Sequence, residues 1–213
     1  MQKDKVTIKR IILRYLALFS GLFIMANGIV FTINANLGVN PWDVLHIGLA
    51  NQTGLTVGRV MQLVGLILLV TSYFLKVRLY TGTILNMIFL GFFVDMILTA
   101  GYISPPELIW NKILLYTCGV VFFGFGVAVY ISPNLGAGPR DSMMLALTRI
   151  TGQKKGLIRT AMEATAATAG LVLGGPLGIG TIIFVLTIGF FMEAGFFVID
   201  HFKRSRIFQH FWF

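Results

Sequence analysis

The sequence predicts an all-α membrane protein: a polytopic bundle of about six transmembrane helices, arranged as two inverted three-helix repeats. Three observations predict this fold class. Of the 213 residues, 56% are hydrophobic and only 12% are charged, which is about half the charged share of a soluble domain. Apolar stretches long enough to cross a bilayer recur along the chain. The second half of the chain also repeats the first half at a fixed offset.

The expected spans are apolar stretches of roughly 20 residues, the length that crosses the hydrocarbon core at about 1.5 Å per residue. The last two are rich in Ala, Thr and Gly, which suits close helix packing within a bundle. In chain order the six spans are about 11–34, 56–75, 84–101, 112–132, 157–173 and 181–199.

Positive charge indicates the orientation of these spans. The net charge is +9. Of the 17 Lys and Arg residues, all but Arg59 and Lys112 fall on one side of the predicted membrane. Because Lys and Arg accumulate on the cytoplasmic side, we expect both termini in the cytoplasm of a bacterial cell and the protein in its inner membrane. Anionic lipid headgroups are the expected partners of these charges. No folded basic domain lies outside the spans, which disfavours nucleic-acid binding.

The internal repeat aligns residues 14–97 with 112–195 without a gap, at an offset of 98 residues, with 21 of 84 positions identical. The identical positions include glycines, a proline and an aspartate, which a shared apolar bias does not align. Each copy holds three spans, an odd number, so the second copy enters the membrane from the opposite side. Inverted repeats of this kind are typical of secondary transporters, whose sites lie between the halves. We expect a single membrane domain over 1–213, with a basic cytoplasmic tail at 200–213.

The repeated stretches read NLGVNPWD (36–43) and NLGAGPRD (134–141). In each, Pro stands where a helix starts and Asp follows in its first turn, where a carboxylate complements the helix dipole. We therefore expect short helices over about 44–51 and 142–150. One interpretation is a re-entrant half-helix that directs its N-terminus at an anion or polar solute. The alternative is an interfacial helix that lies flat, with Trp42 at the headgroup level.

These two motifs, the second extended to NLGAGPRDS, resemble those of the YczE/YyaS/YitT group of bacterial membrane proteins. The resemblance covers essentially the whole chain. It implies an integral inner-membrane protein and assigns no activity.

Two sets of polar residues are candidates for a functional site. The first set, from the repeated motifs, would bind a solute: Asn36, Asn40, Asp43, Asn134, Arg140 and Asp141. The second set consists of carboxylates within predicted spans, where ionisable residues are rare and often functional, and would couple transport to protons or ions. Its members are Asp95 and Glu193, repeat-mates expected near mid-bilayer, and Glu163, which a local ion pair with Arg159 explains equally well.

The sequence contains no G-x-S-x-G, H-E-x-x-H or P-loop motif and no metal-ligand spacing of histidines, so we expect no enzymatic activity, no cofactor and no metal. The function that the pattern favours is transport of an unidentified small solute, with proton coupling as one variant. The alternatives are an accessory or regulatory membrane protein that acts through a partner, and a substrate-capture subunit of a larger importer. A homo-oligomer is compatible with all three.

Overall fold

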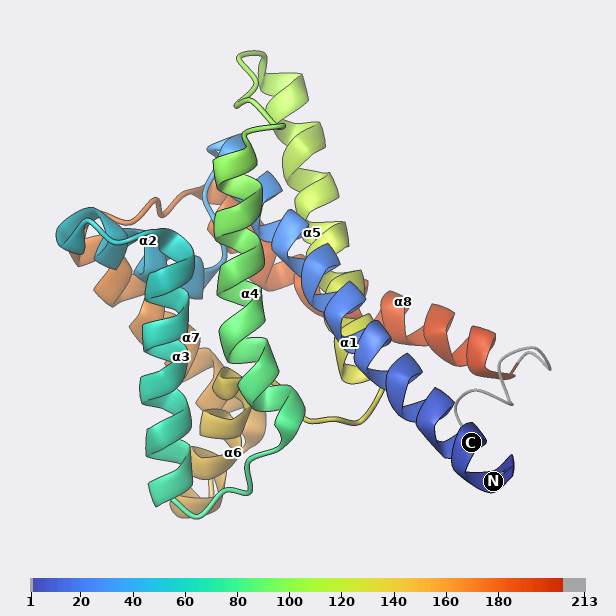
Figure 1. Ribbon diagram of the computed structural model, residues 1–213. Helices are drawn as coiled ribbons and strands as arrows, with labels where there is room; N and C mark the ends of the chain where they lie inside the picture. Colours follow the sequence, from blue (N-terminus) through green and yellow to red (C-terminus); the bar gives the residue numbers. More distant parts are fainter. Residues whose placement is uncertain (1, 205–213) are drawn as a thin grey trace.

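The computed structural model describes residues 2–204. These residues form helices and contain no strand, as predicted (Figure 1). In chain order the helices are α1 (Gln2–Ala35), α2 (Pro41–Thr53), α3 (Val57–Phe74), α4 (Thr81–Ala100), α5 (Ile109–Ile131), α6 (Pro139–Thr151), α7 (Lys155–Val172) and α8 (Ile179–Arg204). Most of the predicted tail, 205–213, lies outside the described residues.

Five of the described helices are long and apolar enough to cross a membrane: α1, α3, α4, α5 and α8. They coincide with five of the six predicted spans. The sixth prediction, 157–173, coincides with α7, which is helical along its 18 residues but does not reach the apolar content of the other five. The reason is local, since Lys155, Arg159 and Glu163 occupy its first three turns.

The two short helices, α2 and α6, start at the predicted prolines, Pro41 and Pro139. Both are 13 residues long, longer than the eight or nine residues predicted. Each continues to a glycine, Gly54 or Gly152, whose φ of about 70° ends the helix in the left-handed region. At about 20 Å, neither helix is long enough to cross a bilayer.

The helices of the two halves correspond closely. At the offset of 98 residues, α2 matches α6 and α3 matches α7 at both ends, and α4 and α8 start at matching residues. The contacts are reciprocal as well. The Gly82 N–H donates to the Leu135 carbonyl at 2.8 Å, and its counterpart, the Gly180 N–H, donates to the Leu37 carbonyl at 2.8 Å.

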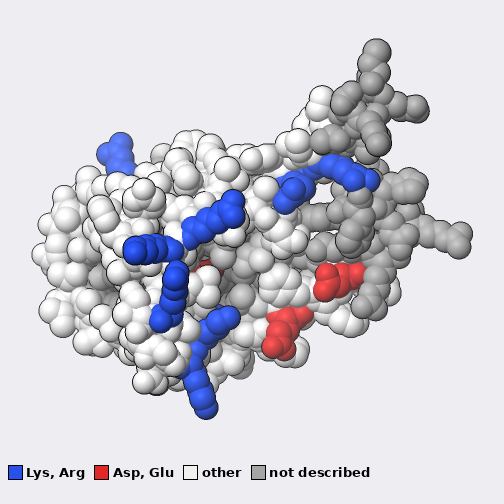
Figure 2. All heavy atoms as spheres, turned by 90° about the horizontal axis from the view of Figure 1, so that it is seen from below, with Lys and Arg blue, Asp and Glu red and all other residues white. Residues whose placement is uncertain are grey.

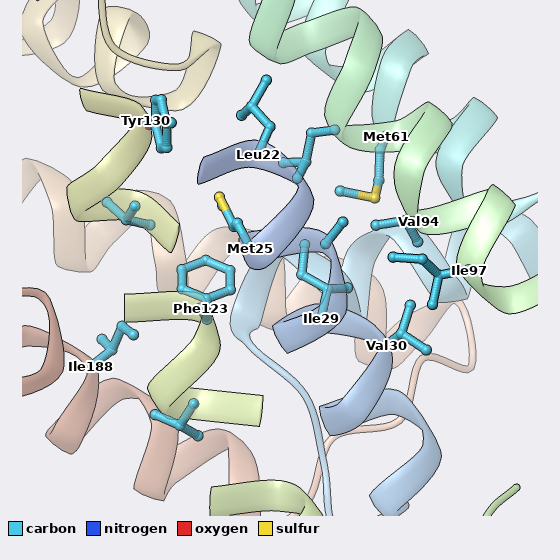
Figure 3. Packing of buried hydrophobic residues seen from close by; sticks show 14 of the residues in the cluster. Leu22, Met25, Ile29, Val30, Met61, Val94, Ile97, Phe123, Tyr130 and Ile188 are labelled. Carbon is cyan, nitrogen blue, oxygen red and sulfur yellow. The ribbon is translucent and has the colours of Figure 1, made fainter. Parts of the chain in front are cut away.

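The core is built around the crossing of α1 and α5. A Cβ added to Gly28 of α1 would lie 2.5 Å from the Phe123 nitrogen, and one added to Gly126 of α5 would lie 2.5 Å from the Met25 nitrogen. Glycine at these positions therefore lets the two backbones approach closely. Side chains of α1 extend from this crossing toward α5 on one side and toward α3 and α4 on the other (Figure 3).

The halves differ in one respect. The α3 helix packs along α4, whereas the corresponding helices α7 and α8 make almost no contact. The α7 helix packs against α2, as its counterpart α3 does against α6, and α8 packs along α5 (Figure 1). The interior of the protein is consequently less enclosed between α7 and α8 than between α3 and α4.

Candidate functional site

A cavity of about 130 Å³ lies between the N-terminal ends of α2 and α6. This volume is similar to that of cavities that accept a benzene-sized molecule, about 150 Å³. Each of the eight helices contributes to its wall. Apolar side chains, several of them methionines, form much of the lining. The polar residues of the lining are Asn40, Trp42, His46, Asn86, Tyr130, Arg140, Asp141, Arg159 and Glu163.

Asn40 organises the α2 side of the cavity as the N-cap of that helix. Its side-chain oxygen accepts hydrogen bonds from the backbone N–H groups of Trp42 at 3.0 Å and Asp43 at 3.1 Å. Its side-chain amide donates to the carboxylate of Asp43. The orphan donors of the first turn are thereby satisfied without solvent.

Asp43 is fully buried directly behind the cavity wall. Besides Asn40, its carboxylate has His46 as a partner, with Nδ1 of the ring 3.1 Å from Oδ1. Burial lowers the pKa of His46, although the hydrogen bond to Asp43 opposes that shift. A neutral imidazole that donates its Nδ1–H to the carboxylate is consistent with both effects.

Arg140 joins the two halves of the protein. It extends from the first turn of α6 toward α2, where one guanidinium nitrogen lies 3.8 Å from Oδ1 of Asp43. The centre of the guanidinium also lies 4.9 Å from the centroid of the Trp42 ring, within the range of a cation–π interaction. A cation from one short helix is therefore held by an anion and an aromatic face from the other.

Asp141 lies beside Arg140 in the cavity wall. The N-cap of α6 is Gly138, which has no side chain with which to cap the helix. Burial raises the pKa of Asp141, and the positive charges of Arg159 and Arg140 oppose that shift. At the α6 end, the carboxylate of Asp141 therefore lines the cavity. At the α2 end, the equivalent carboxylate of Asp43 is bonded by Asn40 and does not line the cavity.

Arg159 and Glu163 form the outer part of the lining. They are joined by a hydrogen bond of 2.9 Å from Nε to Oε1, and 48% of the arginine side chain is exposed. The cavity therefore reaches the protein surface beside α7. Figure 2 shows this end of the molecule, where Lys and Arg side chains surround a hollow with an acidic side chain visible inside it.

The structure brings together four of the six predicted solute-site residues: Asn40, Asp43, Arg140 and Asp141. The other two, Asn36 and Asn134, are exposed and lie away from the cavity. Both have a positive φ, 52° and 55°, so they form the left-handed turns that follow α1 and α5, a conformation that Asn tolerates.

The expectation that Trp42 anchors the protein at the lipid headgroups is wrong. Its side chain is only 9% exposed and lines the cavity beneath Arg140. The ring faces inward because α2 is packed against α7 and α3 rather than lying free at the surface.

Asp95 does not lie at mid-span. It is level with the start of α3, where its carboxylate accepts hydrogen bonds from the Thr56 hydroxyl at 2.5 Å and the Gly58 N–H at 2.7 Å. It therefore acts as a cap for α3. Asp95 lies farther from the start of its helix than predicted, because α4 begins at Thr81, three residues before the predicted span.

Glu193, the repeat-mate of Asp95, is exposed on α8 and does not line the cavity. Glu163, in contrast, does line it. Sequence reasoning missed His46 and Tyr130. A signal for His46 was present, since it lies three residues after Asp43 and hence on the same face of the short helix.

Together, the apolar spans and the cavity with its polar residues between the helices define an integral membrane protein with a helical bundle. The chain belongs to the family of unknown function DUF6198, whose profile matches residues 12–195. This confirms the resemblance to proteins of the YczE/YyaS type.

Three relatives match over most of their length. The uncharacterized membrane protein YczE of Bacillus subtilis is 38% identical over 188 residues, which cover 87% of this chain and 86% of the relative. An uncharacterized protein of Haemophilus influenzae is 32% identical over 81% of this chain and 78% of its own. The uncharacterized protein YyaS of B. subtilis is 28% identical over 85% of this chain and 92% of its own. No solved structure matches this chain.

Proposed function

We propose that this protein is a transporter of the bacterial inner membrane that carries a small solute through the cavity between α2 and α6. The observation that carries the proposal is the contact of Arg140 with Asp43 and Trp42 across that cavity. Polar ends of helices too short to span are stable inside a membrane protein only where they meet protein or line a cavity. Sites of this kind lie between the halves of many transporters.

The proposal treats the two halves as inverted-topology repeats, with α7 as the third crossing of the second half. The matching helix bounds and the reciprocal hydrogen bonds of Gly82 and Gly180 support a two-fold relation between the halves. Two of the charged residues of α7, Arg159 and Glu163, are compatible with a crossing because they form an ion pair and line the cavity.

The solute that fits this cavity is compact, with one polar end and an apolar remainder. Arg140, Asp141 and Asn86 supply charged and amide groups at one end, while methionine and phenylalanine side chains supply the apolar wall. If transport is coupled to protons, Asp141 is better placed than Asp95 to carry them. Asp141 faces the cavity, and Asp95 is held by α3.

Ligand-induced thermal stabilisation of the purified protein tests the proposal, because a solute that binds the native state raises the melting temperature. The panel comprises amino acids, vitamins, nucleosides and small drugs. At least one compound should stabilise the wild type, and Arg140→Ala should remove that stabilisation. Arg149→Ala is the matched control, because Arg149 lies on the same helix but is exposed and outside the cavity.

The same experiment separates the proposed transporter from an accessory protein. Stable co-purification with another membrane protein, combined with no response to the panel in the wild type, would contradict the proposal. An equal loss of the response in Arg140→Ala and Arg149→Ala would place the solute elsewhere.

A further inference from the structure

One pair of helices in the first half has a close crossing that its counterpart in the second half lacks. In α3 and α4, a Cβ added to Gly58 would lie 2.0 Å from the Gly91 carbonyl oxygen, and one added to Gly91 would lie 2.3 Å from that of Gly58. Asp95 closes this crossing by accepting hydrogen bonds from the Gly58 N–H and the Thr56 hydroxyl. We call this arrangement the closed pair.

The second half carries the same kinds of residue at the offset of 98, but they are apart. For the counterparts of the two glycines, Gly156 and Gly189, no atom of the described residues lies within 4 Å of an added Cβ. The counterpart of Asp95 is Glu193, which is exposed and has no hydrogen bond or ion pair with any described residue. We call α7 and α8 in this arrangement the open pair (Figure 1).

No contact among the described residues explains the two glycines and the glutamate of the open pair. A glycine inside a helix destabilises it by about 1 kcal/mol relative to alanine unless a close contact requires it. A carboxylate within an apolar span is also costly unless it has a partner. Both costs disappear if α7 and α8 cross in a second conformation as α3 and α4 do here.

The open pair also borders the cavity. The lining includes Arg159, Met162 and Glu163 from α7 and Phe184, Ile188 and Met192 from α8. The cavity therefore extends into the space between these two helices, and their approach would close it there. The closed pair also lines the cavity, through residues such as Met61 of α3 and Gly91 of α4, but there the two helices are already in close contact.

We propose that α7 and α8 form a gate that closes by the same crossing as α3 and α4, with Glu193 accepting a hydrogen bond from the Gly156 N–H. Lys154, the counterpart of Thr56 at the N-cap of α7, supplies an ammonium group for the same carboxylate. In that conformation Asp95 releases α3, and the cavity opens between α3 and α4 instead. This inference rests on the proposed function in taking the cavity as the solute site.

Distances between paired spin labels test the gate without any solute. In a Cys118→Ala background, one label pair is placed at Leu157 and Phe197, on the open pair. The matched pair is placed at Arg59 and Thr99, the corresponding positions on the closed pair. All four residues are exposed, so labels should not disturb the packing. In the wild type, most molecules should show a long distance between the labels at Leu157 and Phe197. A minor population should show a short distance, equal to the main distance between the labels at Arg59 and Thr99.

Gly189→Leu decides the matter, because leucine has space in the present arrangement but would obstruct the closed crossing. It should abolish the short distance at Leu157–Phe197. Glu193→Gln should reduce that population about tenfold, the effect of losing one charged hydrogen bond. Phe190→Leu is the control, since Phe190 and its counterpart Phe92 are both exposed and lie outside the crossing; it should change neither population.

A single long distance in wild type, unchanged by Gly189→Leu and by Glu193→Gln, would overturn the gate. That result would leave the solute site intact, because binding at Arg140 is measured independently. Conversely, the gate would stand and the proposed function would be overturned if the labels responded as expected in a protein that co-purifies with another membrane protein and binds no member of the solute panel.

Discussion

At the residue scale, two aspartates in equivalent positions have different roles. Asp43 is fully buried and is bonded by Asn40 and His46, with Arg140 nearby. Asp141 occupies the same place in the second motif but faces the cavity. The first carboxylate therefore stabilises the contact between the two halves, and the second is accessible from the cavity.

Substitution should separate these roles. Asp43→Ala leaves the Arg140 cation without its anion and two further donors without an acceptor. Removing one partner from such a buried pair typically costs about 3–5 kcal/mol, so we expect a large drop in melting temperature. Asp141→Asn should change the melting temperature little and instead weaken solute binding. Equal thermal effects of the two variants would contradict this division.

The sequence predicted the parts of this site that depend on local geometry. Pro41 and Asp43 indicated a helix start because both effects act within one turn. The contact of Arg140 with Trp42 and Asp43 could not be predicted, because it depends on how two helices 98 residues apart pack together. Asn36 was assigned to the site through its place in the motif, although its role is to form a turn with a positive φ.

At the element scale, the glycines of the α1–α5 and α3–α4 crossings are in close contact with the neighbouring helix, whereas the equivalent glycines of α7 and α8 are not. The long spans were predictable because apolar length is a property of each segment alone. The depth of Asp95 was not, because it depends on where α4 starts and on its antiparallel packing with α3. Likewise, the sequence aligns Gly91 with Gly189, but only the structure shows that one is packed and the other open.

Alanine substitutions at two glycines should therefore have opposite effects on thermal stability. In Gly28→Ala, the new Cβ would lie 2.5 Å from the Phe123 nitrogen and 2.6 Å from the Gly119 oxygen. Forcing α1 and α5 apart should cost about 1–3 kcal/mol. Gly189→Ala meets no neighbour and should be neutral or stabilising by up to about 1 kcal/mol. Thermal unfolding of both variants in detergent measures the difference in their stability. A Gly28→Ala variant that is more stable than the wild type would contradict the close crossing of α1 and α5.

At the scale of the whole molecule, loops far apart in the sequence gather at two ends. At one end, Arg149 donates to the Lys76 carbonyl at 3.5 Å, which brings the end of α6 to the loop after α3. At the other, Asn34 donates to the Ile103 carbonyl at 3.0 Å. The basic loops lie at the first end, so the charge distribution and the packing favour the same orientation.

This orientation predicts the reactivity of single cysteines with a membrane-impermeant maleimide in a Cys118→Ala background. Arg78→Cys and Lys154→Cys belong to the basic end and should react only after the cells are permeabilised. Ser104→Cys and Leu177→Cys belong to the opposite end and should react in intact cells. All four residues are exposed, so their accessibility reports the side of the membrane rather than burial. Because α7 separates Lys154 from Leu177, labelling of both from the same side would show that α7 does not cross. The second half would then have two crossings instead of three, and the inverted repeat would be excluded.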